Sequence, residues 1–187
     1  HPLLVRGRLF VQLHDQGQLA AFDAYTGRSL WKRTDLPRTL AASSTSLFAG
    51  DGNRVLRVDP ATGGIRQTYQ INAMADDIRE IRVCDGYVAV ASPKMIAVLA
   101  ESSGEVLWTK RAEKGFRHNA IAAGPDRLFV IDGLSEGVMK IVQRRGLTEE
   151  SGSELLALDL QTGRELWSIK DGVFGTWLGL YEEENML

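Results

Sequence analysis

The chain has little of several residue types that carry chemistry. Its 187 residues include a single cysteine, Cys84, and only three histidines. One cysteine excludes an intrachain disulfide, a c-type haem attachment and a cysteine-based metal site. Cys84 lies in an apolar run, so we expect it to be a small core residue. The histidines lie far apart in the sequence and lack the spacing of metal ligands.

Excess positive charge and long hydrophobic runs are also missing. The formal net charge is −2 and the isoelectric point is about 6.0, which argues against a nucleic-acid or anionic-membrane surface. No apolar run approaches the roughly 18 residues of a membrane span. With 44% hydrophobic and 25% charged residues, the composition is that of an ordinary globular domain. We therefore expect no nucleic-acid partner and no membrane span.

Proline is scarce, with five residues, whereas glycine is frequent, with 19. This balance favours a fold with many tight turns. The sequence starts at His1 rather than at an initiator methionine, and we expect it to be a segment of a longer protein.

The most prominent feature is a repeated motif, A-x-D-x-x-T-G-x-x-x-W. Residues 21–31 and 157–167 match it at every fixed position, and residues 98–108 keep the glycine and the tryptophan. Residues 57–67 keep the aspartate, threonine and glycine but lose the tryptophan. The four motif glycines are Gly27, Gly63, Gly104 and Gly163.

Each copy has the features of a β-hairpin. Asp23 can accept hydrogen bonds from the backbone N–H groups just ahead of it, and Gly27 can adopt the positive φ that closes such a turn with a bulge. Trp31 then offers a large apolar surface. Because an isolated hairpin is only marginally stable, each copy is expected to pack against the next. Tyr69 lies two residues beyond the lost tryptophan, and we expect it to cover the same patch.

The spacing of the copies predicts an all-β fold. The motif glycines are 36, 41 and 59 residues apart, and the first two intervals are close to a four-stranded propeller blade of roughly 40–45 residues. We therefore expect a partial β-propeller of four-stranded antiparallel blades. The predicted blades cover about 1–35, 36–71, 72–111 and 112–170, with an insertion at 133–152 and the start of a fifth blade at 171–187.

The insertion interrupts the repeat and is expected to contain a short amphipathic helix at about 136–145. Val138, Ile141 and Val142 follow helical spacing, with Lys140 and Arg144 on the opposite side. The apolar side of so short a helix needs cover from neighbouring loops.

Topology predicts two different faces of the propeller. The Thr-Gly hairpins lie on one face and are short and uniform, so they leave little room for a site. The opposite face carries the insertion and the variable loops, where function usually resides. The candidate binding residues on this face are Arg38, Lys114, Phe116, Arg117, His118, Lys140 and Arg144.

Two interpretations of this face remain open. Its cations could hold an acidic protein partner or an anionic small molecule. Alternatively, they belong to a solvated loop whose Phe116 covers a blade edge, and to the charged outer side of a helix. We assign no catalytic residue and no metal ligand.

The repeat resembles that of the PQQ-like repeat β-propellers. The resemblance extends over nearly the whole chain, and it implies that Trp31, Trp108 and Trp167 dock one blade on the next, with the motif glycines in the turns. It also implies a bacterial protein and a periplasmic or other extracytoplasmic location. The remaining blades of the same propeller are the first expected partners.

The family contains both binding proteins and enzymes. We favour a non-catalytic binding or scaffolding module, as in the propeller lipoprotein of outer-membrane protein assembly. The alternative is a segment of a pyrroloquinoline-quinone-dependent alcohol or sugar dehydrogenase. No cofactor is evident in this segment, and PQQ with calcium is expected only if the full-length protein is a quinoprotein.

Overall fold

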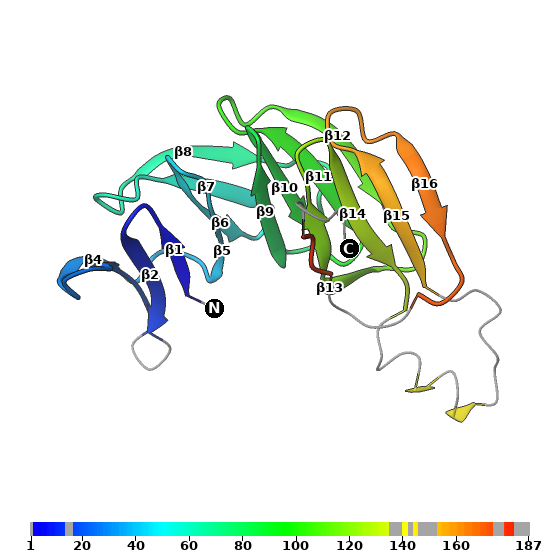
Figure 1. The fold of residues 1–187 in the computed structure, drawn as a ribbon, viewed down its shortest axis with the longest axis horizontal. Helices are drawn as coiled ribbons and strands as arrows, with labels where there is room; N and C mark the ends of the chain where they lie inside the picture. The colour runs from blue at the N-terminus through cyan, green and yellow to red at the C-terminus, as the bar shows by residue number, and fades with distance from the viewer. Residues whose placement is uncertain are drawn as a thin grey trace.

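In the part of the chain that the structure describes, sixteen strands form four separate antiparallel sheets of four strands, with the strands of each sheet in sequence order. The computed structural model describes residues 2–13, 17–134, 140–141, 144–145, 153–173 and 178–181. Figure 1 shows the four sheets fanned out along an arc. The predicted partial propeller of four-stranded blades is confirmed. Among the described residues, no helix is long and apolar enough to cross a membrane.

Each blade runs from an inner to an outer strand. The first blade contains β1 (Leu3–Val5), β2 (Arg8–Leu13), β3 (Gln18–Asp23) and β4 (Ser29–Arg33). The second contains β5 (Thr39–Ala42), β6 (Leu47–Asp51), β7 (Arg54–Val58) and β8 (Ile65–Gln70). The third contains β9 (Glu80–Cys84), β10 (Tyr87–Ala91), β11 (Met95–Ala100) and β12 (Val106–Arg111). The fourth contains β13 (Phe116–Ala123), β14 (Arg127–Asp132), β15 (Glu154–Asp159) and β16 (Glu165–Ile169).

The first strand of every blade is the innermost one. β1 contacts β5, β5 contacts β9, and β9 contacts β13, so these strands surround the axis of the arc (Figure 1). The hydrophobic core lies between blades rather than within them. One cluster, for example, joins Phe10 and Leu19 of the first blade to Leu47 and Leu56 of the second. Each blade is therefore stabilised chiefly by its neighbours.

The Thr-Gly turns form as the motif predicts. Asp23 Oδ1 accepts hydrogen bonds from the N–H groups of Tyr25 at 3.0 Å and Thr26 at 2.8 Å, and these bonds lower the pKa of Asp23. Gly27 has a φ of 71° and donates its N–H to the Asp23 carbonyl. The strand register shifts at the corresponding position in all four blades, which is the bulge expected before such a turn.

The third turn keeps its shape without the aspartate. Gly104 donates its N–H to the Ala100 carbonyl at 2.8 Å, and Glu105 donates to Ser103 Oγ at 3.2 Å. Backbone pairing and the glycine are therefore sufficient for the turn.

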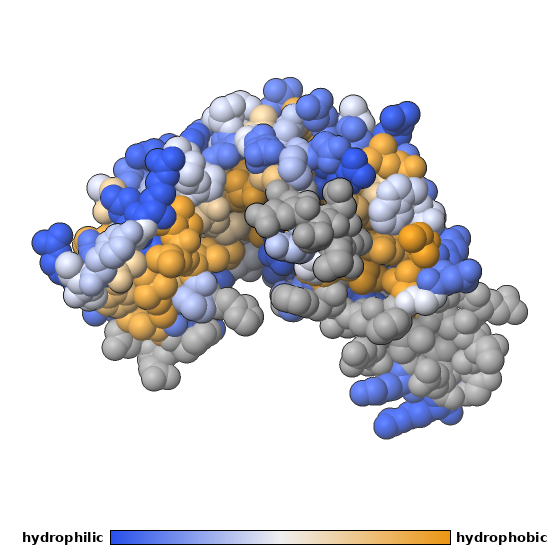
Figure 2. Space-filling view, in the orientation of Figure 1, coloured by the Kyte–Doolittle hydropathy of each residue, from blue (hydrophilic) through white to orange (hydrophobic). Residues whose placement is uncertain are grey.

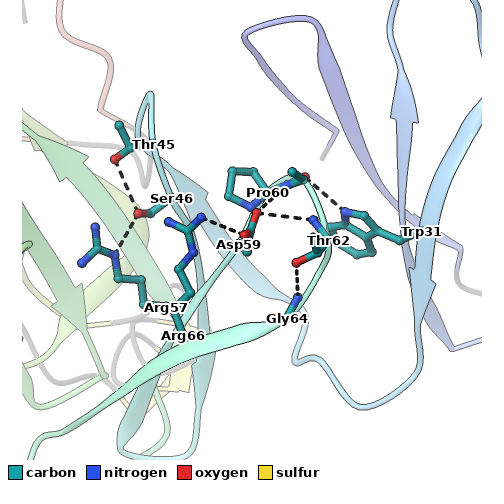
Figure 3. Close-up of polar contacts among 10 residues, drawn as sticks. Trp31, Thr45, Ser46, Arg57, Asp59, Pro60, Thr62, Gly64 and Arg66 are labelled. Carbon is teal, nitrogen blue, oxygen red and sulfur yellow. Dashed lines mark hydrogen bonds and ion pairs between the residues drawn. The ribbon is translucent and has the colours of Figure 1, made fainter.

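An aromatic ring from one blade covers the turn glycine of the next, an arrangement that we call the aromatic–glycine contact. A Cβ on Gly63 would lie 2.8 Å from Trp31 Cδ2, and the Trp31 indole donates to the Pro60 carbonyl at 3.1 Å (Figure 3). Trp108 covers Gly163 in the same way and donates to the Leu160 carbonyl at 2.9 Å.

Tyr69 takes the place of the lost tryptophan, as expected. A Cβ on Gly104 would lie 2.0 Å from Tyr69 Cδ1. The Tyr69 hydroxyl donates to the Glu101 carbonyl at 2.7 Å. In all three contacts the accepting carbonyl lies three residues before the glycine, so the ring is held at both its face and its polar edge.

Trp167 does not have this role in the structure. Its side chain is 37% exposed and packs against Phe129 of its own blade, with ring centroids 5.9 Å apart. Correspondingly, no described atom lies within 4 Å of the position that a Cβ on Gly27 would take. The aromatic–glycine contact needs two neighbouring blades, and neither residue has its second blade within the described part of the chain.

Two predicted segments are described only in part. Residues 135–139 and 142–143 of the expected helix lie outside the described residues. Arg145 donates its N–H to the Ile141 carbonyl at 3.1 Å, and Ile141 is 50% exposed rather than covered. In the expected start of a fifth blade, Leu178 donates its N–H to the Asn119 carbonyl of β13 at 3.0 Å.

The aromatic–glycine contact predicts different costs for two glycine substitutions in the third blade. Gly104 and Gly86 have φ values of 75° and 83°, so alanine adds about 1–2 kcal/mol of backbone strain at either position. Only at Gly104 would the methyl group collide with a ring, which adds about 1–3 kcal/mol. Urea unfolding should show a larger loss of stability for Gly104→Ala than for Gly86→Ala. Equal losses would contradict this account of the contact.

Candidate functional site on the loop face

Hydrogen bonds between connections define two opposite faces, as the topology predicts. On the turn face, the Thr-Gly turns bond to the turns between first and second strands, for example Ala24 N–H to the Gly7 carbonyl. On the loop face, connections between blades bond to those between second and third strands. Phe116 N–H donates to the Pro93 carbonyl there, and Gly133 N–H to the Gly115 carbonyl.

A buried carboxylate shapes the loop before β13. Asp132 is 4% exposed. It accepts hydrogen bonds from the N–H groups of Glu113 at 2.6 Å, Lys114 at 3.0 Å and Gly115 at 2.9 Å. This one side chain therefore fixes the backbone of the loop that we predicted to bind a partner.

The predicted residues after this loop have different environments. Phe116 is 7% exposed and belongs to the core between the third and fourth blades, which favours its alternative role as cover. Arg117 donates from Nη2 to Ser153 Oγ at 2.5 Å, so it ties β13 to the residue that directly follows the predicted insertion. His118 lies on β13, and its side chain is outside the described part.

Glu80 is the second buried carboxylate of this region. It is 4% exposed on β9, forms an ion pair with Arg82, and accepts the Asn119 N–H of β13 at 3.0 Å. Burial raises the pKa of Glu80, although Arg82 and the Asn119 N–H act in the opposite direction. Glu80 and Arg117 line a small hollow of about 10 Å³ with Arg79 and Ser92.

The candidate residues whose side chains are described do not all lie together. Arg38 lines a different hollow, between the first two blades, with Gln12 and Leu36. Lys140 and Arg144 are exposed. Lys114, Phe116, Arg117 and His118 share one loop and the adjoining strand β13.

The turn face has more room than we expected. A hollow of about 290 Å³ there is lined by three arginines, Arg6, Arg8 and Arg28, together with Asp23 and Tyr25. The short hairpins leave this space because the turn between β1 and β2 lies beside the Thr-Gly turn, while Tyr25 is 89% exposed. We expected the short hairpins to leave little room on this face, and this open hollow is larger than that expectation.

Metal-ligating side chains are dispersed in the described part of the chain. No three His, Cys, Asp or Glu residues described by the structure gather closely enough to hold a metal ion. Asp51, the last residue of β6, is paired with Arg54.

Sequence reasoning missed Glu80 and Asp132. A signal for Glu80 was present, because Glu80 and Arg82 alternate with Ile81 and Val83 near the start of the predicted third blade. Asp132 offered no comparable signal, since it ends an apolar strand where an exposed aspartate would be equally ordinary.

Four-stranded blades joined by aromatic–glycine contacts define a PQQ-like repeat β-propeller. The family model described as outer membrane protein assembly factor BamB matches residues 1–85 and 83–173. The chain belongs to this family. No curated protein sequence matches it at a significant level.

Solved structures with the same fold include both binding proteins and enzymes. BamB from Moraxella catarrhalis is 18% identical, with a TM-score of 0.59 over 91% of this chain and 48% of that one. Quinohemoprotein alcohol dehydrogenase from Comamonas testosteroni is 15% identical, with a TM-score of 0.68 over 91% of this chain and 34% of that one. The computationally designed Ika8 protein is 15% identical, with a TM-score of 0.66 over 90% and 48%. The chain thus spans about half or less of the matched chains.

Removal of the Asp132 carboxylate should loosen the loop before β13. Asp132→Ala leaves three backbone N–H groups without their acceptor. We expect a loss of about 3 kcal/mol, since hydrogen bonds to charged groups contribute about 1.5–3 kcal/mol each and the loop can relax toward water. Hydrogen exchange at residues 113–115 should accelerate. Asp132→Asn, which keeps one acceptor oxygen, should give an intermediate effect, and unchanged exchange in both variants would contradict this role.

Glu80 should make the stability depend on pH above its ordinary pKa of 4.5. Because the folded-state pKa is raised, the folded protein binds the proton more tightly than the unfolded chain. The stability that Glu80 contributes is therefore present below pH 4.5 and is lost as the pH rises through the folded-state pKa. Unfolding of wild type and Glu80→Gln between pH 4 and 8 should show the wild type losing stability relative to the variant. A constant difference would contradict the prediction.

Proposed function

We propose that the chain is part of a non-catalytic PQQ-like propeller that binds a protein partner through its loop face. The observation that carries this proposal is that its two buried carboxylates, Asp132 and Glu80, bind backbone N–H groups and an arginine of the chain itself. Asp132 binds three backbone N–H groups, and Glu80 binds Arg82 and the Asn119 N–H. Both groups hold loops and inner strands in place. Such an arrangement suits a rigid platform for binding better than it suits proton transfer.

The partner that we favour is a protein component of outer-membrane protein assembly. The family description supports this class, and so does the similarity in fold to BamB. On the same ground we propose that the protein lies outside the cytoplasm, as the resemblance implies. We expect the partner to contact two parts of the loop face, which are the loop between Lys114 and Arg117 and the adjacent base of the insertion.

A segment of a quinone-dependent dehydrogenase is the second candidate. The similarity in fold to quinohemoprotein alcohol dehydrogenase supports it.

Photo-crosslinking in cells should show which of the two faces binds the partner. A crosslinking amino acid at Lys94 or Asp77, which are exposed on the loop face, should capture an outer-membrane assembly protein identified by mass spectrometry. The matched controls are Thr62 and Gln161, which are exposed on the turn face and should capture none. Capture from the turn face alone would contradict the proposal.

The same full-length protein should be incubated with PQQ and calcium and assayed for dye reduction with alcohols and sugars. We expect no activity above that of the heat-denatured protein. Substrate-dependent reduction would establish the dehydrogenase and overturn the non-catalytic assignment.

A further inference from the structure

The hollow on the turn face lies at the junction between the first two blades. Its volume is about 290 Å³, and it is lined by residues of the first blade and by Ala61 in the Thr-Gly turn of the second. Arg8 and Asp23 face each other in register, on the side of the sheet that carries Phe10. Phe10 packs against the second blade. Both walls of the hollow therefore belong to neighbouring blades of this chain.

Three arginines give this hollow an excess of positive charge. Arg6 and Arg8 lie at the turn between β1 and β2, and Arg28 follows the motif glycine of the first blade. The carboxylate of Asp23 also lines the hollow, and its Oδ1 already accepts three hydrogen bonds within its own turn. Three positive charges and one negative charge leave a formal charge of +2, in a protein whose net charge is −2. Figure 2 shows hydrophilic side chains gathered at this end of the arc, beside the apolar surface of the first blade.

The chain does not neutralise these arginines itself. Among the described residues, no ion pair involves Arg6, Arg8 or Arg28. Hydrogen bonds from Thr26 lower the pKa of Asp23 most, and the charge of Arg28 contributes to the same shift. Asp23 therefore stays ionised near neutral pH, and the excess of positive charge in the hollow remains.

The fourth blade has arginines at two corresponding positions and neutralises one of them. Arg127 corresponds to Arg8, because each lies opposite the motif aspartate in register. Arg164 corresponds to Arg28, because each follows the motif glycine. Asp126 accepts two hydrogen bonds from the Arg127 guanidinium, at 2.8 and 2.9 Å. The residue before Arg8 is a glycine, so the first blade offers its arginine no carboxylate at that place.

We propose that this hollow binds the phosphate group of a small molecule. A phosphate monoester has about −1.5 to −2 charges at pH 7 and three acceptor oxygens, which match the charge of the hollow and its three arginines. The planar guanidinium group donates paired hydrogen bonds to phosphate. The bound phosphate would pair with Arg8 as Asp126 pairs with Arg127. The hollow lies on the face opposite the proposed protein partner, so either proposal can fail without the other.

Tyr25 forms a wall for the rest of such a molecule. Its ring lies beside the turn between β1 and β2, since a Cβ on Gly7 would lie 2.7 Å from Tyr25 Cε2. The residue is 89% exposed, so an organic group attached to the phosphate has an aromatic surface to pack on. We therefore expect phosphate monoesters to bind more tightly than inorganic phosphate.

Calorimetric titration of the full-length protein at low ionic strength tests the site with three probes. These are phenyl phosphate, inorganic phosphate and a tetraglutamate peptide. Phenyl phosphate should bind saturably at one site and more tightly than inorganic phosphate. Equal affinity for the two would support the phosphate site and assign it to inorganic phosphate. No phosphate binding, or tighter binding of the peptide, would overturn the proposal.

Variants of the arginines locate the bound phosphate. Arg8→Gln and Arg28→Gln should each weaken phenyl phosphate binding at least about tenfold, because each removes a charge-assisted contact. Arg164→Gln is the matched control at the same motif position in the fourth blade, and it should leave binding unchanged. Circular dichroism checks the folding of all three variants. Arg28 is exposed in its turn, so Arg28→Gln tests the site even if Arg8→Gln disturbs β2. Phosphate binding that is unchanged in Arg28→Gln, or weakened equally in Arg164→Gln, would overturn the proposal.

Discussion

The contact between an aromatic ring and a turn glycine is the constraint on which the rest of the fold depends. Two separate requirements select glycine at this position. Its backbone adopts a left-handed φ that closes the turn, and its missing side chain leaves the space that the ring of the preceding blade occupies. The carbonyl three residues earlier then accepts the polar edge of the ring. The type of ring is less constrained, since Tyr69 covers Gly104 although it lies two residues beyond the motif position of the tryptophan.

This contact makes each blade dependent on its neighbours. The largest hydrophobic clusters lie between consecutive blades, so a single blade has little core of its own.

The loop face uses charge for structure. Asp132 organises a loop through backbone N–H groups, and Glu80 joins the inner strands of the third and fourth blades. A rigid set of loops on a repeated scaffold is the usual platform for binding in such folds. Membership of the BamB family and the similarity of the fold to that of a quinone-dependent enzyme together show that the scaffold alone does not define the chemistry.

The sequence by itself determined the repeat, the strands and the turns, because these depend on hydrogen bonds between residues close in the chain. Asp23, Thr26 and Gly27 specify a turn wherever they occur in this order, and the alternation of strands and turns assigns every connection to one of two faces. Tertiary structure alone decided which aromatic rings are covered, because the cover comes from another blade. Trp108 and Trp167 occupy the same place in the motif, yet only Trp108 lies over a glycine of a following blade. The roles of Phe116, Glu80 and Asp132 likewise depend on groups 17 to 39 positions away in the sequence. A pattern of neighbouring residues cannot predict contacts over such separations.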